Sequence, residues 1–148
     1  MPSPGDPMPE QQNLEAVRQS LIKFNSGDLE GYLAMFDRAV VFHGLSRKLK
    51  PGVGGLREYY TDLRSAFPDM HLASEDLIAS GEKVANRYTF YGTHKGPYLG
   101  VAPTMKLVVA AGIVFNQFRD GKCVETWQQT DALGFLTQLG VVKPLASK

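Results

Sequence analysis

The segment Val124 to Gly134, VETWQQTDALG, carries a carboxylate near the only tryptophan, at a spacing that could do chemistry. In a β-strand, Trp127, Gln129 and Asp131 would share one face, because side chains alternate between the two faces. Desolvation in a mostly apolar cavity raises the pKa of a carboxylate. Such a group can take the acidic proton between two carbonyls and later return it to the oxyanion. Asp131 is therefore a candidate acid/base for a site on this face.

Each of these residues also has a simpler interpretation. Asp131 precedes ALGFLTQLG, which suits a short helix, and aspartate is a favoured helix N-cap. Trp127 could stack on a planar substrate and exclude water, or it could only fill the core. Gln129 could orient Asp131 or a substrate oxygen. The catalytic and capping roles of Asp131 do not exclude one another.

Further candidate substrate contacts come from other strands and from a helix. His43 and His94 could reach a cavity and act as a second acid/base near neutral pH, although a lone histidine is more often structural. Arg87 would need a carboxylate partner inside a barrel, or it could lie at the rim or a subunit interface. On a predicted helix, Tyr59 and Tyr60 point about 100° apart, so one of them, such as Tyr60, could line the cavity.

Composition predicts one globular domain that binds a small molecule. The chain has 148 residues, 43% hydrophobic and 21% charged, which suffices for one sizeable core. A formal net charge of +1 favours neither nucleic acid nor an anionic membrane as partner. No segment has the length of a membrane span, and the N-terminus lacks signal-peptide features. With one cysteine and no zinc-motif spacing, we expect a cytoplasmic protein without a metal.

The order of predicted elements is helix, helix, strand, helix and then strands. Residues 1–12 hold four prolines and almost no apolar surface, so we predict a disordered tail there, a single domain over 13–142 and a C-terminal tail over 143–148. Asn13 is the expected N-cap of the first helix, and Asp28 that of the second. A third helix should end at Pro68.

The strand predictions form an antiparallel meander. Asp120-Gly121 is a strong hairpin signal, while Gly92 and Gly112 permit the bends that give a sheet a concave face. The predicted strands cover residues 38–45, 70–80, 84–94, 106–118 and 122–131.

In LVVAAGIVF, residues 107–115, both strand faces are apolar, so both faces must be covered. Helices can cover one face, and a second copy of the sheet is the simplest cover for the other. We therefore predict a homodimer through the sheet.

The element order and four local segments resemble the SnoaL-like polyketide cyclases, also labelled ester cyclases, of the nuclear-transport-factor-2-like superfamily. The matching segments, which run from about Phe67 to Gly140, are FPDMH, GTHKGPYLGVAPT, DGKCVETWQQTDALG and the closing QLG.

The resemblance implies an α+β fold, a cone-shaped barrel of strongly curved antiparallel or mixed sheet closed by three helices of the N-terminal half. It also implies a deep pocket without metal or organic cofactor, and an aspartate near the end of the last strand as acid/base in an aldol ring closure. Asp131 matches that aspartate. On the preceding strand, where those cyclases offer a histidine, this chain has Asn116 and Gln117, and Gln117 is a further candidate substrate contact.

Three functions stay open at this stage. The first is cofactor-independent ring closure or isomerisation of an apolar, carbonyl-bearing substrate, with Asp131 as acid/base. The second is epoxide hydrolysis or opening in the same fold, with Asp131 and Arg87 around a water, although Thr89 stands where that chemistry wants a second aspartate. The third is a dimeric module that binds a small ligand without catalysis.

Overall fold

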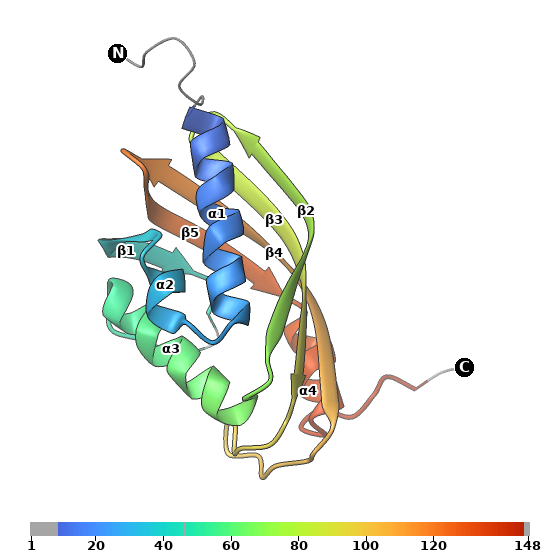
Figure 1. Ribbon diagram of the computed structural model, residues 1–148. Helices are drawn as coiled ribbons and strands as arrows, with labels where there is room; N and C mark the ends of the chain where they lie inside the picture. The colour runs from blue at the N-terminus through green and yellow to red at the C-terminus, as the bar shows by residue number, and fades with distance from the viewer. Residues whose placement is uncertain (1–8, 46, 147–148) are drawn as a thin grey trace.

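The computed structural model describes residues 9–45 and 47–146, and it has the predicted α+β class (Figure 1). Three helices lie in the N-terminal half of the chain, and a short fourth helix follows the last strand. In chain order the elements are α1 (Pro9–Asn25), α2 (Leu29–Leu33), β1 (Phe36–His43), α3 (Val53–Ala66), β2 (His71–Ser80), β3 (Lys83–Thr93), β4 (Leu107–Arg119), β5 (Lys122–Thr130) and α4 (Ala132–Gln138).

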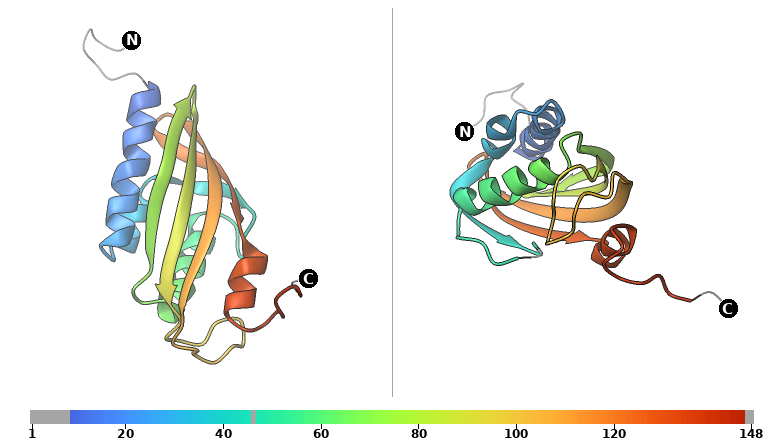
Figure 2. Two further views of the ribbon diagram at one scale, coloured as in Figure 1. Left: turned by 90° about the vertical axis from the view of Figure 1, so that its right-hand side faces the viewer. Right: turned by 90° about the horizontal axis from the view of Figure 1, so that it is seen from below.

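The five strands form one mixed sheet in the order β1-β5-β4-β3-β2. Strands β2 to β5 pair antiparallel as the predicted meander, and β1 adds to the free edge of β5 in parallel. The sheet curls strongly but stays open, and α1, α2 and α3 lie on its concave side (Figure 2). A curled sheet with helices inside its curve is the cone-like architecture that the family resemblance implies.

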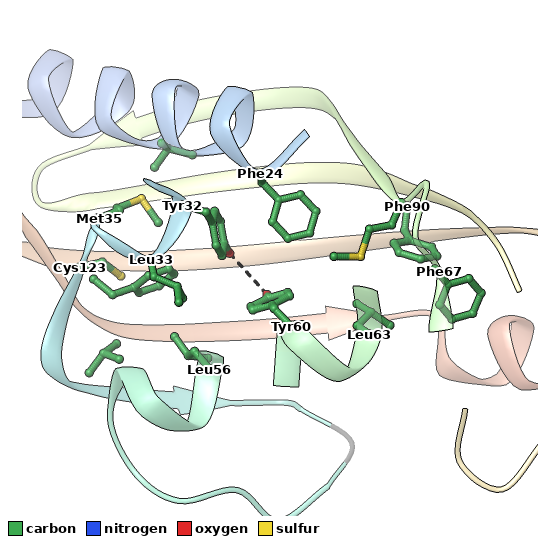
Figure 3. Close-up of a cluster of buried hydrophobic side chains, with 14 of the residues drawn as sticks. Phe24, Tyr32, Leu33, Met35, Leu56, Tyr60, Leu63, Phe67, Phe90 and Cys123 are labelled. Atoms are coloured by element: carbon green, nitrogen blue, oxygen red, sulfur yellow. Dashed lines mark hydrogen bonds between the residues drawn. The ribbon is translucent and has the colours of Figure 1, made fainter. Parts of the chain in front are cut away.

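Aromatic side chains from the helices fill the interior between helices and sheet (Figure 3). The rings of Phe24 and Tyr32 meet edge to face at 5.0 Å, and those of Tyr32 and Tyr60 at 5.3 Å. Edge-to-face pairs add to the free energy gained by burying the rings. This cluster fixes α1, α2 and α3 against one another, and Phe67 and Phe90 continue it toward the far end of α3.

The first helix starts earlier than the sequence predicted. Helix α1 begins at Pro9, whose fixed φ suits the first turn of a helix, and Glu10 accepts a hydrogen bond from the Gly81 backbone at 2.9 Å. Asn13 is buried inside α1, so its prediction as the N-cap is wrong. Residues 9–12 of the predicted tail are thus helical, and residues 1–8 lie outside the described residues.

The convex face of the sheet carries large apolar side chains in the open. Along β4, Val108 and Ala110 are buried toward the helices, whereas Ile113 and Phe115 are 47% and 48% exposed on the other side. Strand β5 adds Trp127 to this convex face. An apolar surface of this kind marks an interaction site in a protein of ordinary composition. We propose that a second copy of the chain covers it.

Phe115→Arg should convert the proposed homodimer to a monomer, because an arginine in the centre of an apolar interface is desolvated without a partner. Light scattering at micromolar concentration measures the change. Ile22→Arg is the matched control, since Ile22 is also an exposed apolar residue but lies on α1. A wild-type mass equal to one chain, or an equal effect of both substitutions, would refute the proposed interface.

Candidate active site

A cavity of about 270 Å³ lies between the concave face of the sheet, α3, α4 and the loop that follows β3. Its wall is mostly apolar and aromatic with a few polar side chains, the usual composition of a small-molecule site. The residues that line this cavity include Tyr59, Tyr60, Leu63, Tyr88, Phe90, Tyr98, Gln128, Thr130 and Phe135.

Strand pairing sets the polar side chains of this wall in rows across the sheet. Tyr88 of β3 lies opposite Gly112 of β4, and Gly112 lies opposite Thr130 of β5. A Cβ at position 112 would lie 2.4 Å from the Tyr88 hydroxyl, so only glycine leaves room for that ring. The Tyr88 phenol therefore passes over Gly112 and places its oxygen 2.7 Å from the Thr130 hydroxyl.

A chain of hydrogen bonds continues from Tyr88 to the helices. The Gln128 amide nitrogen donates to the Tyr88 oxygen at 2.9 Å, and the Tyr60 hydroxyl donates to the Gln128 amide oxygen at 3.3 Å. On the side of Tyr60 toward α2, the Tyr32 hydroxyl donates to the Tyr60 oxygen at 3.4 Å, and Figure 3 shows this hydrogen bond as a dashed line. Hydroxyl and amide groups from a helix and two strands thus meet at one point of the cavity wall.

Burial keeps the phenols of this cluster protonated. Desolvation raises the pKa of Tyr32, Tyr59 and Tyr60 far above the ordinary tyrosine value. It also raises the pKa of Tyr88, against the lowering effect of the hydrogen bonds with Thr130 and Gln128. At neutral pH these hydroxyls are neutral groups that can donate a hydrogen bond to a ligand oxygen.

Because the folded chain holds these phenols neutral, their contribution to its stability should be constant up to about pH 10, where unfolded tyrosine ionises, and should fall at higher pH. Absorbance at 295 nm during alkaline titration, with circular dichroism in parallel, measures both. The four buried tyrosines should ionise only as the fold is lost. Their ionisation in a chain that keeps its native circular dichroism would contradict this account.

The predicted base, Asp131, caps a helix at the edge of the cavity. Its carboxylate accepts a hydrogen bond from the Gly134 backbone at 2.9 Å, as the N-cap of α4, and is exposed. The N-cap interpretation is therefore confirmed. The neighbouring residues Thr130 and Ala132 border the cavity, whereas the Asp131 side chain is not part of its wall. The acid/base role of Asp131 stays a prediction.

The expected alignment of Trp127 with Asp131 in one pocket is wrong. Trp127 lies on the convex face, where its ring stacks on His43 with centroids 5.5 Å apart. His43 in turn places its Nε2 2.7 Å from a Glu125 carboxylate oxygen. Gln129 does border the cavity, but from Thr126 onward the more buried side chains of β5 are those of Thr126, Gln128 and Thr130.

Two other predicted contacts lie away from the cavity wall. Arg87 is on the convex face, and its Nε donates to Asp76 at 2.6 Å, so the sheet's own alternation excludes it from the interior. Gln117 donates to Glu82 beside the turn between β2 and β3. These placements do not support a substrate contact for either residue.

His94 is fully buried and holds the loop after β3. Its Nδ1 accepts a hydrogen bond from the Thr104 backbone at 3.1 Å, and its ring stacks on Phe67 at 5.4 Å. The same loop carries Tyr98, which lines the cavity. His94 therefore orders one side of the site from behind. Of the predicted residues, Tyr60 and Gln129 are the two that border the cavity itself.

The remaining groups give little support to metal or thiol chemistry. Within residues 9–45 and 47–146, no three His, Cys, Asp or Glu side chains gather as metal ligands. Burial raises the pKa of the Cys123 thiol to about 12, which leaves almost no thiolate at neutral pH. No helix of the described chain is long and apolar enough to cross a membrane.

Asp131→Ala should lower the free energy of unfolding by about 1 kcal/mol, because the Gly134 amide loses its acceptor at the helix end. Asp131→Asn should stay near wild type, since asparagine caps helices as well as aspartate. Urea denaturation of the two variants measures the difference. Equal stability of the alanine variant and wild type would mean that the cap contributes nothing to folding.

Comparisons with known proteins agree with this architecture. A family model described as SnoaL-like polyketide cyclase matches residues 15–139. IdmH from Streptomyces antibioticus, a candidate polyketide cyclase, is 29% identical with a TM-score of 0.75, over 88% of this chain and 99% of that one. TsrD from Streptomyces laurentii is 27% identical with a TM-score of 0.77, over 93% and 98%.

AclR from Streptomyces galilaeus, a candidate hydroxylase, has a TM-score of 0.84 at 24% identity, over 93% of this chain and 91% of that one. At this identity the likeness shows a shared fold. A comparison with curated protein sequences found no match.

Proposed function

Because the chain belongs to the SnoaL-like polyketide cyclase family, we propose that it is a cofactor-independent enzyme that promotes ring closure or isomerisation of a small apolar substrate carrying a carbonyl group. The observation that carries this proposal is the meeting of the Tyr60, Tyr88 and Gln128 polar groups in the wall of an aromatic cavity. The likeness to IdmH, a candidate polyketide cyclase, also supports it.

The tyrosine hydroxyls would act on the substrate carbonyl. When a proton leaves the carbon beside a carbonyl, negative charge develops on the carbonyl oxygen. Tyr88 can donate its O–H to that oxygen, because its raised pKa keeps the phenol protonated at neutral pH. A donor held in place in a dry cavity stabilises such an oxyanion more strongly than water does. Gln128, bonded to Tyr88, would fix the direction of the phenol.

Asp131 would take the proton at the margin of the cavity. It stands between two wall residues, Thr130 and Ala132, and no aspartate or glutamate belongs to the cavity wall in the described chain. To act, its carboxylate must release the Gly134 amide, which costs about 1 kcal/mol, the usual contribution of a cap. This cost is small beside the contribution of a positioned base.

Exchange of the α-protons of 2-tetralone with deuterium oxide, followed by proton NMR, tests the proposal. The compound is an apolar bicyclic ketone, and exchange reports proton removal without knowledge of the natural substrate. Wild type should accelerate exchange. Asp131→Asn should lose roughly 10²-fold or more while keeping the helix cap, and Tyr88→Phe should lose roughly 10²-fold.

Tyr91→Phe is the matched control for Tyr88→Phe, because Tyr91 is a tyrosine of the same strand on the convex face. Its exchange rate should equal that of wild type. Exchange at the wild-type rate in Asp131→Asn would remove Asp131 from the mechanism, and the same result in Tyr88→Phe would remove the oxyanion donor.

A second candidate function is a small-ligand-binding module without catalysis. It is favoured by the neutral hydroxyl and amide character of the cavity wall, in which the described residues include no carboxylate. Binding of 2-tetralone with no acceleration of exchange would decide for it. The epoxide alternative needed Arg87 beside Asp131, and Arg87 instead pairs with Asp76 on the convex face.

A further inference from the structure

The concave interior continues past the tyrosine wall into a second space of about 40 Å³, here called the inner chamber. Tyr60, Tyr88 and Gln128 border both spaces, so their side chains form the partition between them. On the far side, Asn86 of β3 and Asn116 of β4 face the chamber from the sheet. Apolar side chains of α1, β1 and α3 line the rest of the chamber, together with the polar residues Ser20 of α1, His43 of β1 and Thr126 of β5.

The amide oxygens of both asparagines already accept hydrogen bonds from side chains of the sheet. The Asn86 oxygen accepts a hydrogen bond from Ser74 at 2.6 Å, and the Asn116 oxygen accepts one from Thr126 at 2.8 Å. The Cys123 thiol adds a weaker contact to the Asn116 oxygen at 3.6 Å. With their oxygens occupied in this way, neither amide nitrogen donates to any described residue.

An amide N–H of a buried asparagine that borders a cavity is stabilised by an acceptor placed in that cavity. Asn86 and Asn116 are 2% and 4% exposed, and a buried N–H without a partner is destabilising. No lysine, arginine, aspartate or glutamate of the described chain borders the chamber. The one imidazole at its border, His43, already places its Nε2 2.7 Å from the Glu125 carboxylate. An anion in the chamber would therefore lose its hydration without a free compensating charge, so an uncharged oxygen is the acceptor that suits the chamber.

We propose that Asn86 and Asn116 form a donor subsite that binds a carbonyl or ether oxygen at the leading end of the ligand, while the ligand's apolar body lies in the outer cavity. This inference rests on the proposed use of that cavity as a ligand site. A ligand that reaches the asparagines from the outer cavity passes Tyr60, Tyr88 and Gln128, the side chains that border both spaces.

Calorimetric binding of two related ketones, 2-tetralone and 6-methoxy-2-tetralone, tests the subsite. The second compound carries an ether oxygen at the end opposite its ketone. Wild type should bind it roughly 5-fold more tightly, the factor given by one net hydrogen bond of about 1 kcal/mol. Asn86→Leu and Asn116→Leu, which keep the side-chain size, should lose this preference and keep the affinity for 2-tetralone.

Asn13→Leu is the matched control, because Asn13 is a buried asparagine on α1 that borders neither space. It should retain the wild-type preference. If Asn116→Leu fails to fold after losing its bond from Thr126, Asn86→Leu alone decides.

Equal affinity of the two ketones for wild type would overturn the inference and leave the chamber to ordered water, for which its volume suffices. A preference that survives in both leucine variants would overturn it as well. Calorimetry measures binding without turnover. A preference for 6-methoxy-2-tetralone in a protein that does not catalyse proton exchange would therefore support the donor subsite and refute the proposed enzymatic function. If neither ketone binds, the outer cavity is not the proposed site and both proposals fail.

Discussion

A β-bulge at the start of β5 determines which side chains reach the interior of the protein. Strand β4 pairs Phe118 with Cys123 but Gln117 with Glu125, so Val124 is an extra residue without a partner. An extra residue reverses the alternation of the strand beyond it. Cys123 is buried on one side of the bulge, and Thr126 is buried on the other. Everything that β5 contributes to the cavity, including Gln128 and Thr130, depends on this one irregularity.

The bulge also explains what could and could not be predicted from the sequence. The helices, the strands and their order follow from residue periodicity and turn chemistry, including the Asp120-Gly121 hairpin, whereas the cone-like fold was implied by the family resemblance. Regular alternation along β5 predicts Trp127 as an interior side chain. Because of the bulge, Trp127 instead lies on the convex face. A bulge depends on pairing with the neighbouring strand, so the single-strand pattern contained no signal for it.

Gly112 shows a second limit of sequence reading. The sequence predicts that Gly112 permits a bend in its strand. The structure shows a further need for glycine at this position, because the Tyr88 ring occupies the space that a side chain would fill. The hydrogen bond between Tyr88 and Thr130 spans three strands. No spacing along the chain relates Tyr88 to Thr130, because their proximity arises only when β4 pairs with both neighbours. The tyrosine cluster was therefore missed except for Tyr60.

The interior that results is polar without being charged, and this restricts its chemistry. Tyr60, Tyr88 and Gln128 can polarise a carbonyl or stabilise an enolate, but neutral phenols and amides cannot remove a proton from carbon at neutral pH. A base has to come from the margin of the cavity or from the substrate. Asp131 is at that margin because α4 begins where β5 ends, and the cap that holds its carboxylate also keeps it in water. The exposure of the Asp131 carboxylate separates it from the donors of the cavity wall, so a role as base requires a substrate that reaches both.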